Sequence, residues 1–269
     1  MADVTVVVAT RDRAADLERS LPQHEGPVVV VDNASTDGTA DVAHRHGACV
    51  IALERNAGAA ARTYGVRAAT TPYVAFADDD SWWAPGALAR AAAVLTAHAD
   101  LAVLAATVLV GPEQRLDPVC ACMARSPLPP TAAGPAVLGF VACGAVVRRD
   151  AYLAVGGFCD RYGVGGEEEL LALDLATAGW RLAYVAEVVA HHHPSAARDP
   201  GRRQVVQWRN ALWTAWLRRP VPVGVRLAVR AAQQPAGRAG LREAVRHAPW
   251  VLRQRQKVPG HLESLLARL

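Results

Sequence analysis

Three consecutive carboxylates, Asp78, Asp79 and Asp80, directly follow the apolar run 73–77. Neighbouring acids repel one another and resist desolvation, so gathering them at a strand end needs a partner of opposite charge. Carboxylate oxygens suit Mg²⁺ or Mn²⁺, and a bound Mg²⁺ usually keeps coordination positions for phosphate oxygens. The triplet therefore indicates a metal–diphosphate site, although an isolated run of this kind is more often a solvated acidic turn.

Two later stretches carry groups that could serve the same chemistry. Glu167, Glu168 and Glu169 precede a helix expected over 170–178. Acids at a helix N-terminus interact favourably with the helix dipole, and one held there could also act as a general base.

Three histidines, His191, His192 and His193, follow a strand expected over 181–189. If the strand continues, alternation places His191 and His193 on one face and His192 on the other. A neutral imidazole can complete a metal site made of carboxylates, whereas exposure is the default for three histidines in a loop.

Apolar strand-like runs alternate with segments of helical spacing through the first hundred residues. This alternation is typical of an α/β fold with a mostly parallel sheet, in which ligands collect at the carboxyl ends of the strands. The expected strands are 4–9, 28–31, 50–53 and 73–77, and the expected helices are 14–21, 39–46 and 59–69.

Polar side chains follow three of these strands, where that rule places a binding site. Thr10 and Arg11 follow the first strand, Asp32 the second and Asn56 the third. Turn formation would explain Asp32 equally well, and Arg62 could be an ordinary exposed helix arginine. No glycine-rich dinucleotide or P-loop fingerprint follows the first strand, so neither of those sites is supported.

The second half continues with strands expected at 101–110 and 138–147. Between them, 111–135 is rich in proline and glycine, and its length predicts an irregular loop, mobile or substrate-facing, outside the core. A short helix is expected from Arg148 to the glycine pair Gly156-Gly157.

Length and composition limit the classes of protein. A chain of 269 residues, 52% hydrophobic, can form one large domain or one domain with an extension. Its five cysteines form no CxxC pair, which favours reduced thiols in a cytoplasmic protein over a disulfide framework or zinc site. The first residues predict a strand and not a signal peptide, and no apolar stretch is long enough to span a membrane.

The net charge of +4 is unevenly distributed. Residues 1–199 carry 15 arginines against 23 acids, whereas residues 200–269 carry 13 arginines and one lysine against two glutamates. We therefore expect a catalytic domain over 1–199 and a basic helical extension over 200–269. The extension, with a helix at 205–218, could pack on the catalytic domain, lie against an anionic membrane or bind nucleic acid. We expect packing with membrane proximity, because no nucleic-acid-binding motif is present.

The order and spacing of the motifs resemble those of inverting glycosyltransferases of family 2, which have the GT-A fold. Those proteins share a strand followed by Thr-x-Arg, then VVDNxSxDGT, RNxGxAxARxxG, Asp-x-Asp, a Gly-rich segment with GGF, an acidic motif, AGW and a late histidine. The resemblance covers roughly residues 3–195, and Gln207-Trp208-Arg209-Asn210 further suggests the rhamnosyl- and galactofuranosyl-transferase-like branch. The corresponding segments are 6–11, 30–39, 55–65, 76–80, 144–158, 166–169, 178–180 and 191–193.

The resemblance implies a nucleotide-binding half over about 1–100 and an acceptor half over about 101–199. In the first half it assigns roles to residues that follow the strands. Thr10, Arg11 and Asp32 would line the nucleobase and ribose, and Asn56 and Arg62 would lie near the ribose and phosphates.

The resemblance also assigns the metal site and the base. Asp78 and Asp80 would form the Asp-x-Asp pair, with Asp80 as the direct ligand of Mg²⁺ or Mn²⁺. His191 is the best match to the late metal-binding histidine, with its two neighbours as alternatives. Glu168 would be the catalytic base, with Glu167 as the neighbouring candidate.

Two positions depart from the family pattern. The base is glutamate where aspartate is common, and Leu170 stands where the family often has a further aspartate. Because Leu170 replaces that further aspartate, no residue of this chain is assigned the role in acceptor binding that the aspartate has in the family.

The implied function is a metal-dependent inverting transfer of a sugar from a nucleotide-diphosphate sugar to a hydroxyl. The acceptor would be a glycan, a lipid-linked molecule or a small molecule, met in a bacterial cytoplasm or at the inner face of the membrane. One alternative is a nucleotidyltransferase of similar fold, but the first strand lacks its glycine-rich basic loop. The other is a non-catalytic sugar-nucleotide-binding protein, which the loss of the acids would have favoured.

Overall fold

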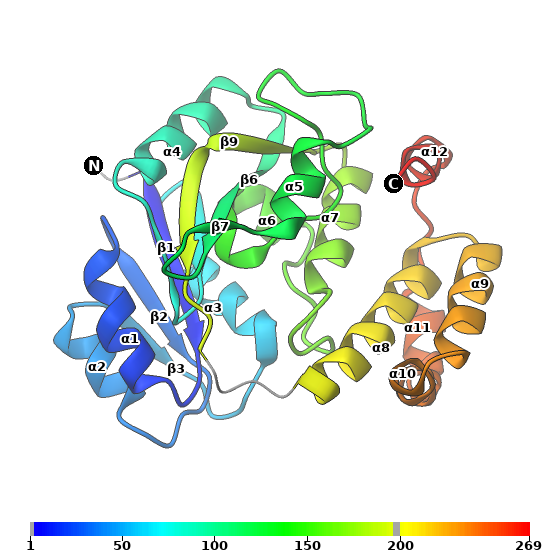
Figure 1. Ribbon diagram of the computed structural model, residues 1–269, viewed down its shortest axis with the longest axis horizontal. Coiled ribbons are helices and arrows are strands. Elements are labelled where there is room, and N and C mark those ends of the chain that lie inside the picture. The colour runs from blue at the N-terminus through cyan, green and yellow to red at the C-terminus, as the bar shows by residue number, and fades with distance from the viewer. Residues whose placement is uncertain (1–2, 196–199) are drawn as a thin grey trace.

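The computed structural model describes residues 3–195 and 200–269 (Figure 1). The strands are β1 Val4–Thr10, β2 Val28–Asp32, β3 Cys49–Ala52, β4 Tyr73–Ala77, β5 Ser81–Trp83, β6 Leu101–Val110, β7 Arg115–Leu116, β8 Ala145–Arg148 and β9 Arg181–His192. The α-helices are α1 Ala14–Ser20, α2 Thr39–Arg45, α3 Ala61–Ala68, α4 Ala87–Ala97, α5 Pro118–Ala124, α6 Arg149–Ala154, α7 Glu167–Thr177, α8 Pro200–Arg218, α9 Val221–Ala232, α10 Pro235–Arg246, α11 Ala248–Gln254 and α12 Gly260–Leu266. Three 3₁₀ turns, η1 Leu21–Gln23, η2 Gly58–Ala60 and η3 Ala142–Gly144, complete the described elements.

The strands form one mixed sheet in the order β3-β2-β1-β4-β8-β6-β9-β5, with β7 paired to β6. The first four strands are parallel, as the alternating pattern predicts. Val7 packs on one face of β1, and Val6 and Val8 pack on the other. Continuous valine runs form these strands because helices cover both faces of the sheet (Figure 1).

The second half of the sheet mixes directions. β8 is antiparallel to both β4 and β6, and β9 is parallel to β6. The short strand β5, which begins one residue after Asp80, pairs antiparallel with the end of β9. This pairing brings the histidines to the acidic triplet.

The prediction of a wholly irregular loop over 111–135 was wrong for part of that segment. Asp117 caps helix α5 by accepting a hydrogen bond from the Val119 N–H at 2.8 Å, and Pro118 occupies the first turn. Cys120 and Met123 are buried in the main core. Two turns of helix are too short for hydrophobic periodicity to show.

Residues 200–269 form helices that pack against α7 and the segment before it. Trp213 and Leu217 of α8 share a core with Tyr162 and Leu170, which lie before and within α7. An ion pair between Arg218 and Asp174 joins the same two helices. Among the residues that the structure describes, no helix combines the length and apolar character needed to cross a membrane.

Candidate active site

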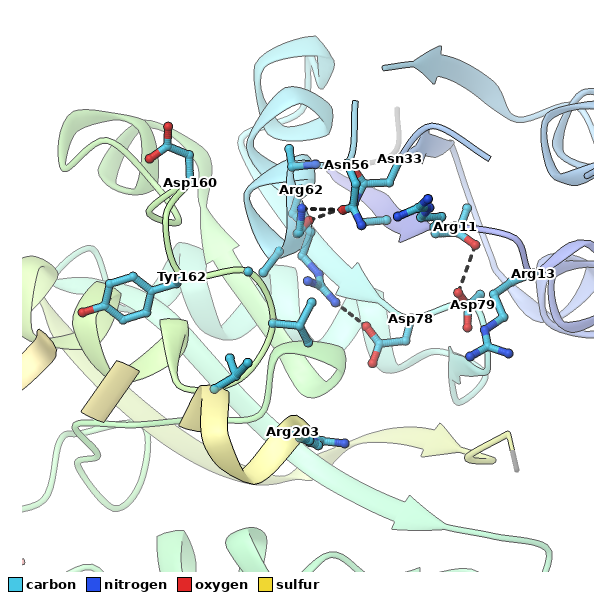
Figure 2. Close-up of a pocket in the computed structure, with 18 of the residues that line it drawn as sticks. Arg11, Arg13, Asn33, Asn56, Arg62, Asp78, Asp79, Asp160, Tyr162 and Arg203 are labelled. Carbon is cyan, nitrogen blue, oxygen red and sulfur yellow. Dashed lines mark hydrogen bonds and ion pairs between the residues drawn. The ribbon is translucent and has the colours of Figure 1, made fainter. Parts of the chain in front are cut away.

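A cavity of about 720 Å³ opens at the carboxyl ends of β1, β2 and β4 (Figure 2). Figure 2 shows Arg11, Asn33 and Asn56 on one side and Asp160 and Tyr162 on the other. Seven residues singled out from the sequence lie outside the lining: Asp32, Glu167, Glu168, Glu169, His191, His192 and His193. Those that line it are Thr10, Arg11, Asn56, Arg62, Asp78 and Asp80.

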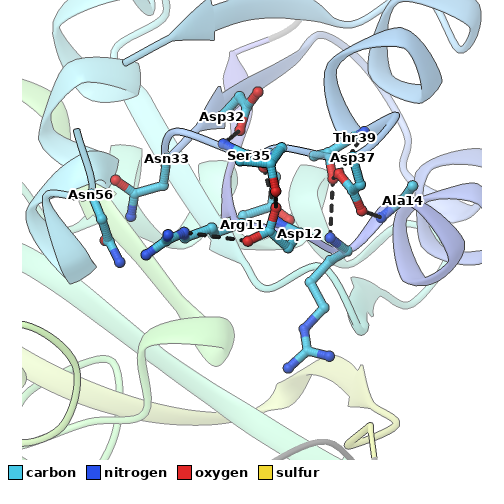
Figure 3. A network of polar contacts seen from close by, with 12 residues as sticks. Arg11, Asp12, Ala14, Asp32, Asn33, Ser35, Asp37, Thr39 and Asn56 are labelled. Carbon is cyan, nitrogen blue, oxygen red and sulfur yellow. Dashed lines mark hydrogen bonds and ion pairs between the residues drawn. The ribbon is translucent and has the colours of Figure 1, made fainter. Parts of the chain in front are cut away.

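The loops after β1 and β2 hold each other in place (Figure 3). The Asp12 carboxylate accepts a hydrogen bond from the Thr36 N–H at 2.7 Å, and Ser35 Oγ accepts one from the Asp12 N–H at 2.9 Å. Asp12 adopts a left-handed backbone with φ of 51°. The Asp32 carboxylate accepts a hydrogen bond from the Ser35 N–H at 2.9 Å, so it stabilises the turn whether or not it also contacts a ligand.

Asn33 is a cavity residue that the motif analysis did not single out. Its Oδ1 accepts a hydrogen bond from the Ala57 N–H at 2.7 Å, and its Nδ2 donates to the Gly58 carbonyl at 3.1 Å. The side chain is buried and lines the cavity. Its place directly after β2 was the signal that could have identified it.

Arg62 is buried and forms an ion pair with Asp78 inside the cavity. Burial alone would lower the pKa of this guanidinium, but the negative charges of Asp78, Glu167 and Glu168 outweigh burial and raise it. Its buried Nε has no hydrogen-bond partner among the described residues. Arg62 is therefore a fixed cation between the acidic triplet and the acids of α7, and not the exposed helix residue that composition would favour.

Asp79, the middle acid of the triplet, points toward β1 and accepts a hydrogen bond from Thr10 Oγ1 at 2.9 Å. Burial, followed by the charges of Asp78 and Asp80, raises its pKa to about 7. The triplet thus divides into a half-buried middle acid held by Thr10 and two flanking acids, of which Asp80 is buried.

The flanking acids meet a histidine. Ligand atoms of Asp78, Asp80 and His192 all lie within 4.8 Å of one another. β5 pairs with β9 so that Ser81 is opposite His192, and His192 Nε2 lies 3.3 Å from Asp80 Oδ1. Two carboxylates and one imidazole are a donor set that suits Mn²⁺ or Mg²⁺.

The structure places His191 away from this group. Its ring stacks on Trp82, with ring centroids 5.6 Å apart, and His193 also contacts Trp82, at 4.7 Å. The expected alternation of the histidines is therefore confirmed. The histidine that faces the carboxylates is His192.

The three acids of α7 have three different surroundings. Glu167 is 3% exposed and accepts a hydrogen bond from the Gly165 N–H; burial and the charge of Glu168 raise its pKa to about 7. Glu168 also has a raised pKa, chiefly through burial, with Arg62 opposing that rise. Burial likewise raises the pKa of Glu169, and the charge of Arg219, which directly follows α8, opposes that rise.

The segment 162–166 before α7 is held by α8, which sequence reasoning did not anticipate. Asn210 is fully buried and donates to the carbonyls of Tyr162 at 2.9 Å and Gly165 at 2.6 Å. Arg209 donates to the Tyr162 carbonyl and lies over the Trp213 ring. On the other side, the Gly163 carbonyl accepts a hydrogen bond from the Ala59 N–H at 2.8 Å.

The fold defined by this sheet and cavity is that of GT-A glycosyltransferases. The mannosyltransferase PcManGT from Pyrobaculum calidifontis, in complex with GDP-Man and Mn²⁺, is similar with a TM-score of 0.63 at 20% identity, covering 99% of this chain and 85% of that one. S. aureus TarS is similar with a TM-score of 0.57 at 18% identity, covering 78% and 43%. GalNAc-T7 with UDP, GalNAc and Mn²⁺ has a TM-score of 0.63 at 13% identity, covering 81% and 48%.

Residues 5–156 match the sequence model of Glycosyl transferase family 2, and the chain belongs to that family. A stretch of 73 residues is 49% identical to uncharacterized glycosyltransferases of Mycobacterium bovis and Mycobacterium tuberculosis. That stretch is 27% of this chain and 34% of each relative, so the match spans about a third of the relatives' length.

Proposed function

We propose that this protein is a metal-dependent inverting glycosyltransferase that moves a sugar from a nucleotide-diphosphate sugar to an acceptor hydroxyl. The observation that carries the proposal is the cluster of Asp78, Asp80 and His192, whose two carboxylates line the cavity together with Arg62. Solved structures of the same fold include proteins bound to GDP-Man, or to UDP and GalNAc, with Mn²⁺. The rhamnosyl- and galactofuranosyl-transferase-like branch stays a prediction.

In this proposal the nucleoside occupies the side of the cavity formed by the loops after β1, β2 and β3. Thr10, Arg11 and Asn56 line that side, and Asp32 lies next to it with its carboxylate engaged in a turn. Arg62 offers its buried, unpartnered Nε–H to a phosphate oxygen, because a buried donor without an acceptor is costly.

Asp78, Asp80 and His192 would hold the Mg²⁺ or Mn²⁺. His192 takes the ligand role that the resemblance gave first to His191, because its nitrogen is the one near the carboxylates. When bound, the ion would neutralise the charge that develops on the leaving diphosphate. Ser195 N–H donates to Asp80 Oδ2 at 3.0 Å and so helps to fix the orientation of that ligand.

Glu168 is proposed as the base that removes the proton of the acceptor hydroxyl. The charges of Arg62 and Asp78 both act on its pKa, so Glu168 lies near these two residues, although it does not line the cavity itself. Glu167 instead engages the Gly165 N–H, which supports a structural role. Attack from the side of α7, away from the diphosphate, would invert the anomeric configuration.

The test combines nucleotide binding with turnover. UDP, dTDP, GDP and CDP are titrated calorimetrically with and without Mn²⁺, and the donor class that binds is used for transfer. Glu168→Gln should bind nucleotide within about threefold of the unmodified protein and lose turnover by at least a hundredfold. Retained turnover would exclude Glu168 as the base, and failure of every nucleotide to bind the folded protein would exclude the function.

We also propose that the extension 200–269 touches an anionic membrane on the cytoplasmic side. Val221, Val225 and Val229, spaced four residues apart on α9, are 64%, 55% and 56% exposed, and Leu252 of α11 is 72% exposed. Val221, Val225 and Leu252 line an apolar cavity of about 280 Å³. This stripe lacks a covering element in the described chain, and insertion into a lipid interface would bury it.

The positive charge of the extension also supports an anionic membrane as its partner. The two acids of the extension, Glu243 and Glu263, are both paired with arginines, whereas Arg226 and Arg230 beside the stripe are exposed. Flotation with phosphatidylcholine vesicles, with and without phosphatidylglycerol, should show binding to the anionic vesicles only. Val225→Glu should abolish it and the exposed Leu116→Glu on β7 should not; absence of flotation at low salt would remove the proposal.

A further inference from the structure

The cavity has more positive charge at one end than the proposed donor and metal can use. Its lining combines residues of the nucleotide side with residues of the segment 160–164 and of α8. Figure 2 shows Arg203 projecting from α8 toward Asp78, on the opposite side of the cavity from Asn33 and Asn56. The two ends therefore have separate charge balances.

At the nucleotide end, charges of opposite sign match. Arg11, Arg13 and Arg62 face the three aspartates 78–80 across the lining. A divalent ion would then be balanced by the two ionised phosphates of the donor. This end needs no further anion.

At the other end, arginines are in excess. The lining there contains Arg161, Arg202, Arg203 and Arg209 against the single carboxylate of Asp160. Glu243, which stands behind the lining, pairs with Arg202 and Arg209. Counted over the described residues alone, about two positive charges are left over, and the concave site strengthens their attraction for an anion.

Arg161 and Arg203 are the two arginines that carry this surplus. Arg161 lies over the Trp250 ring at 5.2 Å, which orients its guanidinium without neutralising it. Arg203 is exposed on the first turns of α8, and no carboxylate of the described chain lies within ion-pair distance of it. The N-terminal turns of α8 add partial positive charge on the same side.

We infer that the acceptor substrate carries an anionic group, a phosphate in chemical class, which Arg203 and Arg161 bind beside the donor. This inference rests on the proposed function, since it assigns the second substrate of that reaction. A guanidinium binds a phosphate through two parallel hydrogen bonds, so two such groups select an anionic acceptor over a neutral one of equal size.

The test titrates phenyl phosphate, and benzyl alcohol as its neutral counterpart, into protein saturated with Mg²⁺ and the nucleoside diphosphate that it binds. Phenyl phosphate should bind and benzyl alcohol should not. Arg203→Glu should weaken phenyl phosphate binding at least tenfold, and Arg203→Lys, which keeps the charge but loses the paired hydrogen bonds, should weaken it less than Arg203→Glu does. Arg268→Glu, an equal charge change at an exposed position after α12, should leave binding unchanged.

Three results would overturn the inference: no phenyl phosphate binding, equal binding by Arg203→Glu, or displacement of phenyl phosphate by the nucleotide. The last would show that these arginines hold the donor. Dodecyl phosphate below its micelle concentration separates the sources of the anion, since tighter binding indicates a lipid-borne phosphate and equal binding a soluble one. If phenyl phosphate binds but no nucleotide does, the proposed function is refuted, whereas the anion-binding site formed by Arg203 and Arg161 is still supported.

Discussion

Asn210 should hold the segment 162–166, which directly precedes the helix of the proposed base, and its removal should affect both stability and turnover. Asn210→Ala deletes the donors to the Tyr162 and Gly165 carbonyls. The Tyr162 carbonyl keeps the hydrogen bond from Arg209, whereas the Gly165 carbonyl is left buried without this donor. A lost hydrogen bond costs about 1 kcal/mol and an orphaned buried acceptor about 2 kcal/mol, so we expect a loss of about 3 kcal/mol.

The expected shift in melting temperature follows from chain length. At about 2.1 cal/mol/K per residue, unfolding a chain of 269 residues has an entropy of about 0.56 kcal/mol/K, so 3 kcal/mol lowers Tm by about 5 °C. Gln204→Ala, an exposed amide on the same helix, is the matched control and should shift Tm by less than about 1 °C.

Turnover distinguishes positioning from mere stability. Well below the melting temperature, kcat of Asn210→Ala should fall by about a hundredfold, because a shift of about 1 Å in the base can cost that much. Nucleotide affinity should stay within about threefold, since the nucleotide side is built by other loops. A Tm shift below 2 °C, or an unchanged kcat despite the full shift, would refute the argument.

Three further predictions concern other parts of the molecule. Gly58→Ala should lower the free energy of unfolding by about 2 kcal/mol or more and weaken nucleotide binding, because the φ of Gly58 is +59° and a Cβ there would lie 2.6 Å from Gly163 Cα. The control is Gly139→Ala, which has open space around it and should change the free energy of unfolding in urea by less than about 0.5 kcal/mol. Burial lowers the pKa of His24 to about 4, whereas the unfolded chain takes up this proton near pH 6.5, so the protein loses up to about 3 kcal/mol of stability as pH falls between these values. His24→Gln should remove this part of the stability loss between about pH 7.5 and 4.5. An identical loss in the unmodified protein and in His24→Gln would contradict the prediction. Mn²⁺ should raise the melting temperature of the unmodified protein and not that of Asp80→Ala, and an equal rise would show that the ion binds elsewhere.

The parallel half of the fold was predictable because its evidence is local. Strands β1, β2 and β4 are short apolar runs buried on both faces, which leaves a continuous hydrophobic signal in the sequence, whereas the edge strand β3 is only partly buried. The rule that ligands collect at the carboxyl ends of such strands then places Thr10, Arg11 and Asn56, which do line the cavity.

Long-range pairing explains most of what the sequence could not show. Alternation separates His192 from its neighbours, but only the pairing of Ser81 with His192 decides which face meets the carboxylates. Asn210 looks like any polar residue in an amphipathic helix, and its partners lie 45 and 48 positions away in the chain. Arg62 shows the reverse case, since its type and position suggest exposure and the acids around it explain its burial.

The bonds from Asn210 also set an order of events during synthesis. The acidic triplet and the proposed base leave the ribosome well before the helix that fixes the segment between them, because Gly165 and Asn210 are separated by 45 positions. At about 5–20 residues per second, that separation corresponds to roughly 2–9 s of translation. His192 is made 27 positions after Gly165, so only over the last 18 positions before Asn210 would the nascent chain have all three proposed metal ligands without the hydrogen bonds that fix the segment before the proposed base.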